Sequence, residues 1–448
     1  MKKFIESISN VWKIEELKNR ILITLGLLLV YRFGAQVTLP GIDATQLANL
    51  AGQTKEGIGS ILDMFTGGAF SQASVFALGI MPYISASIVV QLMGIAIPYL
   101  QKLQSDGESG RKKINQITRW LTIVITLVQG PTYIYNLYKT LPGSAFLLGF
   151  SSFEFLFSSV IILVTGTIFA MWLGEKITDK GIGNGISLLI MVGILARFPQ
   201  AFIQEFTTRV TNNNGGPMLL VIEIIIWLLV IIACVLLTMA IRKIPVQYAR
   251  RTASGDFEQD MLGGNRQWIP LKLNASGVMP IIFAQAIMFI PAALAGLSNS
   301  DTSQSIAGAF SNMFGFWYNF VFAALIVIFT FFYTAITVPT NKMSDDLKRS
   351  GGFIPGVRPG VETSDFLDKV MSLITFPGSL FLALIAVFPA IVVSLMDVQQ
   401  SWAMFFGGTS LIIMVGVAID TIQQINSYLL NKHYDGLMKS GKNRKAVA

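Results

Sequence analysis

Ten long apolar runs divide this chain, and they constrain its fold more than any other feature. Each is close to the roughly 20 residues that an α-helix needs to cross a bilayer. The runs lie at about 21–39, 75–98, 117–137, 153–173, 185–199, 217–241, 274–297, 316–338, 371–393 and 402–425. Charged residues make up only 13% of the sequence, against about 25% in an average soluble domain. The sequence therefore predicts an all-α polytopic membrane protein with ten transmembrane helices.

The distribution of lysine and arginine sets the orientation of these spans, because cytoplasmic loops carry an excess of both. With the N-terminus inside, all but five of the 33 lysines and arginines fall in predicted cytoplasmic segments. The exceptions are Arg32, Lys55, Lys139, Arg197 and Arg209. We expect both termini to be cytoplasmic, with a polar tail at 426–448. Residues 1–20 lack a small-residue cleavage site, which favours an amphipathic helix over a signal peptide.

The residue types that support most enzyme chemistry are scarce. The single histidine, His433, lies in the polar tail, and the single cysteine, Cys234, lies in an apolar run and cannot form an intrachain disulfide. The glycine-rich GIGNGIS at 181–187 follows a membrane helix rather than a strand, so it is not a nucleotide-binding loop. We expect no catalytic residues, no metal site and no cofactor, and hence a protein that is not an enzyme.

The stretch from Asp63 to Gly94 departs from an ordinary lipid-facing helix. A half-length apolar segment at 58–65 is stopped by Gly67 and Gly68, and the following run carries a proline and polar side chains. Non-helical backbone at membrane depth persists only where it is buried in protein or lines a cavity. We therefore expect a re-entrant segment at about 58–70 inside a pore or a binding cavity, with the two glycines as its hinge.

Two predicted cytoplasmic segments, 242–273 and 338–370, are longer than adjacent helices need and are basic. Within the second, GGFIPGVRPG at 351–360 combines glycines and prolines that specify a rigid turn. It carries Arg358, with Lys348 and Arg349 just before it. These segments are candidates for docking an acidic partner or an RNA. The positive-inside rule alone also accounts for their charge.

Seven motifs, in order along nearly the whole chain, resemble the bacterial members of the SecY/Sec61-alpha family. They lie at Tyr31–Asp43, Phe65–Leu92, Gly107–Arg119, Thr165–Ile190, Leu271–Ala284, Leu347–Gly360 and Phe405–Asp420. The resemblance implies two pseudo-symmetric five-helix halves, 21–200 and 217–425, around an hourglass pore, with an external hinge loop at 201–216. It also implies a seam that opens sideways into lipid. The re-entrant segment would be the plug of this pore. Its residues and hinge are Ile61, Leu62, Met64, Phe65, Gly67 and Gly68.

The resemblance further implies a function and site residues. The chain would be the central protein-conducting subunit of a translocase in the bacterial cytoplasmic membrane, passing unfolded polypeptides and releasing apolar segments into lipid. Ile80 and Ile84 share one helix face, as do Ile186 and Ile190. An apolar ring dewets and blocks ions. From spacing alone these isoleucines are better explained by ordinary helix packing, and the match to the family motifs reverses that interpretation. The implied pore ring is Ile80, Ile84, Ile186, Ile190, Ile282 and Ile413, and the implied lateral gate is Ser85, Gln129 and Gln285.

The resemblance also implies partners. They are SecE-like and SecG-like small membrane subunits, a SecA-like motor ATPase, the ribosome, signal peptides, unfolded precursor proteins and membrane lipid. Docking is assigned to Arg250, Arg251, Lys348, Arg349 and Arg358. Between 252 and 267 the sequence departs from the basic tip of the family, because Asp256, Glu258 and Asp260 lie there. Arg250, Arg251 and Arg266 are the residues that could replace it.

An alternative is an ion-coupled secondary transporter, which broken helices also suit. Such a protein needs an ionisable group near the bilayer midplane, and the best candidate is Glu223 on the sixth span. At 1.5 Å per residue it lies only about 9 Å from the start of that span at Pro217. An intramembrane enzyme would need a catalytic constellation at depth, and the sequence offers none.

Overall fold

A computed structural model describes residues 12, 14–43, 47, 63–142, 145–146, 152–211, 216–248, 266–295 and 312–444. The chain divides into two compact units, which are described separately. Unit 1 comprises residues 1–207 and 417–448, and unit 2 comprises residues 208–416.

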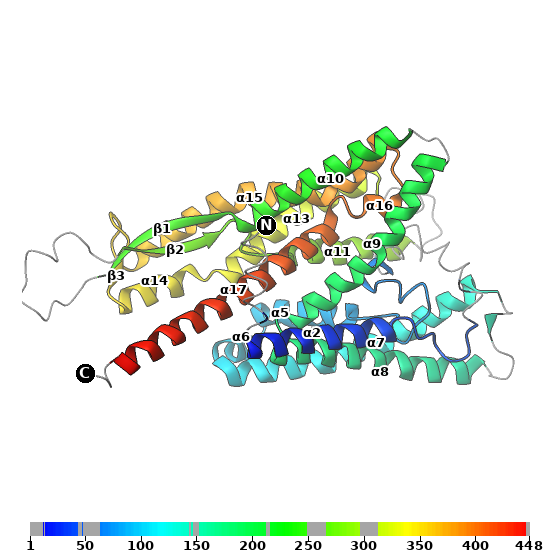
Figure 1. Ribbon diagram of the computed structural model, residues 1–448, viewed down its shortest axis with the longest axis horizontal. Coiled ribbons are helices and arrows are strands. Elements are labelled where there is room, and N and C mark those ends of the chain that lie inside the picture. Colours follow the sequence, from blue (N-terminus) through cyan, green and yellow to red (C-terminus); the bar gives the residue numbers. More distant parts are fainter. Residues whose placement is uncertain are drawn as a thin grey trace, which may run out of the picture. The chain divides into compact units, whose positions relative to one another are not determined.

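Unit 1 is built from helices that begin with the first apolar run (Figure 1). They are α2 (Glu15–Gly34), α5 (Met81–Ala96), α6 (Pro98–Ser105), α7 (Gly107–Thr140), α8 (Ser152–Lys180) and α9 (Gly185–Thr211), the last of which enters unit 2 at Thr208. Since α2 begins at Glu15, the end of the predicted N-terminal amphipathic helix is continuous with the first apolar run.

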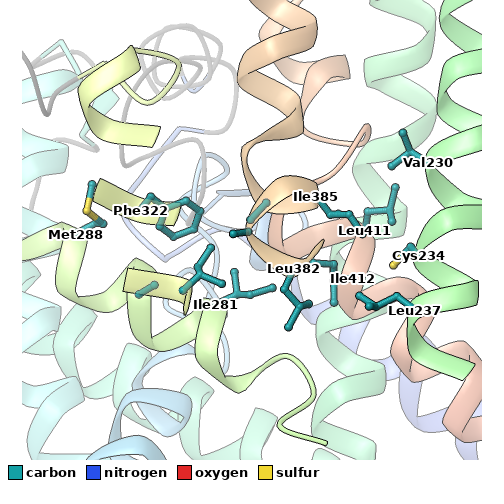
Figure 2. Close-up of a cluster of buried hydrophobic side chains, with 14 of the residues drawn as sticks. Val230, Cys234, Leu237, Ile281, Met288, Phe322, Leu382, Ile385, Leu411 and Ile412 are labelled. Carbon is teal, nitrogen blue, oxygen red and sulfur yellow. The ribbon is translucent and has the colours of Figure 1, made fainter. Parts of the chain in front are cut away.

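Unit 2 contains helices and a small sheet. The helices are α10 (Gly216–Met239), α11 (Met279–Ala295), α13 (Phe316–Thr337), α14 (Thr340–Arg349), α15 (Val361–Met396), α16 (Gln400–Ala403) and α17 (Gly408–Arg444), which enters unit 1 at Val417. Buried side chains of α10, α11, α13, α15 and α17 form one apolar core, and Figure 2 shows residues of this core. Cys234 lies in this core, fully buried as a free thiol.

Every one of the ten apolar runs overlaps a described helix. Among the described residues, six helical segments are long and apolar enough to cross a membrane, and a seventh joins them if α5 and α6 form one broken span bent by 104°. The helical, polytopic membrane protein predicted from the sequence is therefore confirmed, whereas the count of ten spans stays a prediction.

Two of the differences between helix bounds and apolar runs bear on the predicted re-entrant segment and hinge loop. The second run begins at Val75, but residues 66–80 form turns and α5 begins only at Met81, where Pro82 occupies its first turn. Glycines with positive φ explain this, because Gly67 (65°), Gly68 (93°) and Gly79 (53°) interrupt any helix. The fifth run, by contrast, continues as helix through Pro199 to Thr211, across much of the predicted loop at 201–216.

A three-stranded antiparallel sheet in unit 2 was not predicted. Its strands are β1 (Ile241–Tyr248), β2 (Arg266–Lys272) and β3 (Gly352–Phe353), in the order β2-β1-β3. Ile244 pairs with Ile269, and Gln247 pairs with Phe353. One face packs with α14 and the start of α15 around Ile244, Val246 and Leu367 (Figure 1). The two long segments at 242–273 and 338–370 thus fold against each other.

Candidate functional site

The six isoleucines predicted to form a pore ring divide between the two units. In unit 1, Ile80 and Ile84 lie one turn apart at the start of α5, where the Ile84 N–H donates to the Ile80 carbonyl at 3.0 Å. Ile186 and Ile190 lie in the first two turns of α9. In unit 2, Ile282 is half-buried in α11 and Ile413 is buried in α17. Because the ring draws on both units, its closure stays a prediction.

A polar network, which sequence reasoning missed, surrounds the turn at Gly67 and Gly68 in unit 1. The Asp63 carboxylate pairs with the Arg197 guanidinium of α9 and accepts the Ser71 N–H at 2.8 Å. Arg197 also donates to the Ser71 hydroxyl at 2.7 Å. From α2, Arg32 donates to the Gly67 carbonyl at 2.9 Å. The only sequence signal was that Arg32 and Arg197 lie outside the predicted cytoplasmic segments.

The same turn approaches α9 so closely that only glycine fits. A Cβ built on Gly67 would lie 2.8 Å from the Gly193 backbone and 2.7 Å from Arg32 Nη1. A Cβ on Gly193 would lie 2.6 Å from the Phe65 carbonyl oxygen. Met64 and Phe65 are buried beside this turn. Ile61 and Leu62, the other residues predicted for the re-entrant segment, lie outside the described residues.

The glycine-rich turn between α8 and α9 is held by helices from both ends of the chain. From α2, the Thr24 hydroxyl accepts the Ile182 N–H at 3.0 Å. From α17, the Gln424 side chain accepts the Gly183 N–H at 2.8 Å. Asn184 caps α9 by accepting the Ile186 N–H at 3.2 Å. The turn therefore fixes where α9 begins, and with it the position of Ile186 and Ile190.

Glu223, the residue on which a transporter would depend, is engaged in an ion pair. Its carboxylate lies 2.9 Å from Arg209 Nη2, and the two side chains are 0% and 3% exposed. Arg209 also donates to the carbonyls of Met396 and Asp397, at 2.8 and 3.1 Å, at the end of α15. The pair therefore ties the last turn of α9 to α10 and α15 within unit 2.

The predicted lateral-gate residues also divide between the units. Ser85 on α5 is half-buried and Gln129 on α7 is exposed in unit 1, whereas Gln285 on α11 is half-buried in unit 2. The structure does not bring the three together within one unit, so the gate stays a prediction.

The glycine-proline segment at 351–360 forms an ordered tip. Ile354 is buried, the Ser344 hydroxyl donates to the Gly360 carbonyl at 2.6 Å, and the Thr363 hydroxyl donates to the Arg358 carbonyl at 2.8 Å. The Arg358 side chain is 87% exposed, and Lys348 and Arg349 are exposed in the last turn of α14.

The other two docking residues, Arg250 and Arg251, lie outside the described residues. So do the acidic residues Asp256, Glu258 and Asp260 and the side chain of Arg266. Within the described ranges, no group of three or more His, Cys, Asp or Glu side chains could hold a metal ion.

Comparisons with known proteins agree on one family. The SecY family model matches residues 74–422. The protein translocase subunit SecY of Haemophilus influenzae is 42% identical over 427 residues, which cover 95% of this chain and 94% of that protein. The subunit of the same name from Thermotoga maritima is 38% identical over 446 residues, covering 98% and 99%.

Two solved structures share the fold. One is described as the structure of a protein conducting channel, with a TM-score of 0.55 and 18% identity over 92% of each chain. The other, canine Sec61 in a ribosome-channel complex from the endoplasmic reticulum, has a TM-score of 0.51 and 17% identity over 92% of each chain.

Proposed function

This chain belongs to the SecY family, and on that premise we propose that it is the central protein-conducting subunit of a membrane translocase. It passes unfolded polypeptides across the membrane and releases transmembrane segments sideways into lipid. The observation that carries the proposal is the 42% identity to a SecY subunit over 95% of the chain. The apolar helices support it, since a channel for polypeptides must itself span the membrane.

The resting channel is sealed by apolar side chains rather than by a charged filter. The ring consists of Ile80, Ile84, Ile186, Ile190, Ile282 and Ile413. Branched apolar groups form a constriction that water leaves, and a dry constriction blocks ions. They offer no hydrogen bonds, so they accept any polypeptide sequence. The half-buried or buried state of all six, rather than exposure on an outer helix face, supports this role.

The energy for transport comes from partners. Motor-driven or ribosome-coupled passage uses the exposed tip around Arg358, with Lys348 and Arg349 beside it. The canine Sec61 relative is a ribosome-channel complex, which supports a ribosome as one partner. SecE-like and SecG-like subunits and a SecA-like motor complete the assembly in the bacterial cytoplasmic membrane, with both chain termini in the cytoplasm.

The transporter alternative is not favoured. A coupling carboxylate must exchange its proton or ion with water during each cycle. Glu223 is instead fully buried against Arg209, an arrangement that holds helices together.

The experiment that tests the function is reconstitution. Vesicles containing this chain with the subunits that co-purify with it are supplied with a motor ATPase, ATP and a precursor carrying a signal peptide. We expect the precursor to become resistant to external protease, and a precursor without its signal peptide to remain sensitive. Vesicles that fail to protect the precursor but accumulate a small solute along an ion gradient would establish the transporter instead.

A further inference from the structure

We propose that Asp63 and Arg197 form an ion-pair latch that holds residues 63–71, the described part of the re-entrant segment and the turn after it, in the closed position of the channel. The latch comprises these two residues and Ser71, and Arg32 supports it. The inference rests on the proposed function and deepens it, because it assigns the closed state to a specific electrostatic contact in addition to the apolar ring. Nothing in the sequence motifs singles out this contact, since its two charged residues lie 134 positions apart.

The latch closes the segment 63–71 on itself. One Asp63 carboxylate oxygen accepts the Ser71 N–H at 2.8 Å, and the Asp63 carbonyl accepts the Gly68 N–H at 2.8 Å. The second carboxylate oxygen pairs with Arg197, which also donates to the Ser71 hydroxyl at 2.7 Å. The Arg197 guanidinium on α9 therefore contacts both ends of the segment, Asp63 and Ser71.

A second guanidinium reaches the same turn from another helix. Arg32 on α2 donates to the Gly67 carbonyl at 2.9 Å, and a Cβ on Gly68 would lie 3.1 Å from the Arg197 guanidinium. The guanidinium groups of Arg32 and Arg197 thus both contact the segment 63–71, in which the acidic residue is Asp63. Because the two cations repel each other, the Asp63 carboxylate is needed to hold both of them there.

Burial strengthens the Asp63–Arg197 ion pair, and an unsatisfied donor beside it allows the pair to be released. The Asp63 side chain is 12% exposed and that of Arg197 is 27% exposed, so water screens the pair less than at a surface. The Arg197 Nε–H is buried and meets no acceptor within the described part of the chain. When the segment moves away, that group and the Asp63 carboxylate both gain water. The latch is therefore stable when shut and can be released.

Two other ion pairs have a different setting. Arg209–Glu223 connects helices of unit 2, and Arg119–Glu175 connects α7 to α8 with two contacts, at 3.0 and 2.5 Å. Asp63–Arg197 instead joins α9 to a single helical turn at residues 63–65 and, through Ser71, to the turns that follow at residues 66–80. An ion pair on an irregular segment can break when that segment alone moves, whereas breaking a pair between two helices requires whole helices to separate. This difference points to gating.

The test measures the ion conductance of resting channels in planar bilayers, using the chain with its native subunits. Asp63→Asn and Arg197→Gln should each raise resting conductance about tenfold, which corresponds to about 1.4 kcal/mol of lost closed-state stability. Both should also let precursors with weakened signal peptides cross. The charge-swapped variant Asp63→Arg with Arg197→Asp should return both readouts toward the wild type. Glu175→Gln, which breaks the helix–helix pair, is the matched control and should change neither.

Wild-type resting conductance and unchanged signal-peptide selectivity in both single variants would overturn the latch. A purely structural role would give lower yield and stability without a change in conductance, and this result would also overturn it. If Arg197→Gln does not fold, Ser71→Ala and Arg32→Gln test the same network with smaller expected increases. Precursor protection by the wild-type complex is measured in parallel, so failure of the proposed function is recognised separately.

Discussion

At the scale of single residues, the arginines outside the predicted cytoplasmic segments explain more than the motifs do. Arg32, Arg197 and Arg209 each reach into the protein to carbonyl or carboxylate oxygens. A guanidinium inside a protein is costly unless it is paired or hydrogen-bonded. Each of these arginines therefore connects its own helix to the carbonyl or carboxylate oxygens of another segment. Lys139, by contrast, lies over the Tyr135 ring at 4.8 Å near the end of α7.

The pair Arg209–Glu223 gives a stability prediction. Arg209→Ala or Glu223→Ala should destabilise the protein by about 3–5 kcal/mol, because each leaves an uncompensated buried charge. At about 1 kcal/mol per degree for a chain of this length, the midpoint of thermal unfolding should fall by roughly 3–5 °C. The measurement is thermal unfolding of the purified complex in mild detergent.

The double variant Arg209→Met with Glu223→Leu is the control for this prediction. It removes both charges and should recover most of the lost stability, since apolar replacements of buried pairs are often neutral. Single variants as stable as the wild type would show that the pair does not tie α9 to α10 and α15.

At the scale of elements, α5 and α9 each place two isoleucines one turn apart near their N-terminal ends. Ile84→Asn and Ile190→Asn should wet the predicted ring and raise the ion conductance of resting channels, because an amide holds water in a constriction. The conductance should rise about tenfold or more if the closed state loses at least about 1.4 kcal/mol of stability. Bilayer recordings on the reconstituted complex measure it.

The same two helices provide the controls. Val89 on α5 is 39% exposed and Leu195 on α9 is 53% exposed, so Val89→Asn and Leu195→Asn introduce the same amide away from the ring. These controls should leave conductance unchanged. Equal conductance in all four variants would remove Ile84 and Ile190 from the ring.

Helix existence could be predicted from the sequence, but helix bounds and the sheet could not. Apolar length alone is enough to place a helix in a membrane, which is why all ten runs overlap helices. The end of α9 was missed because Arg209 is stabilised by distant partners, which no local pattern reveals. The sheet was missed because Pro245 and Pro270 argue against strands. Pro270 lies on the edge strand β2, and β3 pairs only with Gln247 and Tyr248.

At the scale of the whole molecule, the predicted lateral gate joins residues of both units. After replacement of Cys234 by alanine, cysteines at Ser85 and Gln285 should form a disulfide when the seam is shut. The crosslink should block release of apolar segments into lipid and translocation of precursors, and a reductant should restore both. Protease protection of a precursor and carbonate-resistant insertion of a membrane protein are the two measurements.

Each single-cysteine variant serves as a control and should translocate at the wild-type rate with and without oxidant. Full activity of the crosslinked form would rule out a gate between these positions. The ring and gate residues were assigned only through the resemblance to the family, and the pairing of Asp63 with Arg197, which spans 134 positions, was not predicted. Such pairs depend on tertiary packing, and neither spacing nor composition records them.

The turn at Gly181–Gly185 has a consequence for synthesis of the protein. Gly183 donates its N–H to Gln424, which lies 241 residues later in the chain. At about 5–20 residues per second, the ribosome reaches Gln424 roughly 12–48 seconds after it has added Gly183. Unit 1 is therefore incomplete until all of unit 2 has been synthesised, and α17 is the helix that completes it. A chain truncated by premature termination before α17 would leave the glycine turn without its last hydrogen-bond partner and expose it to quality-control proteases.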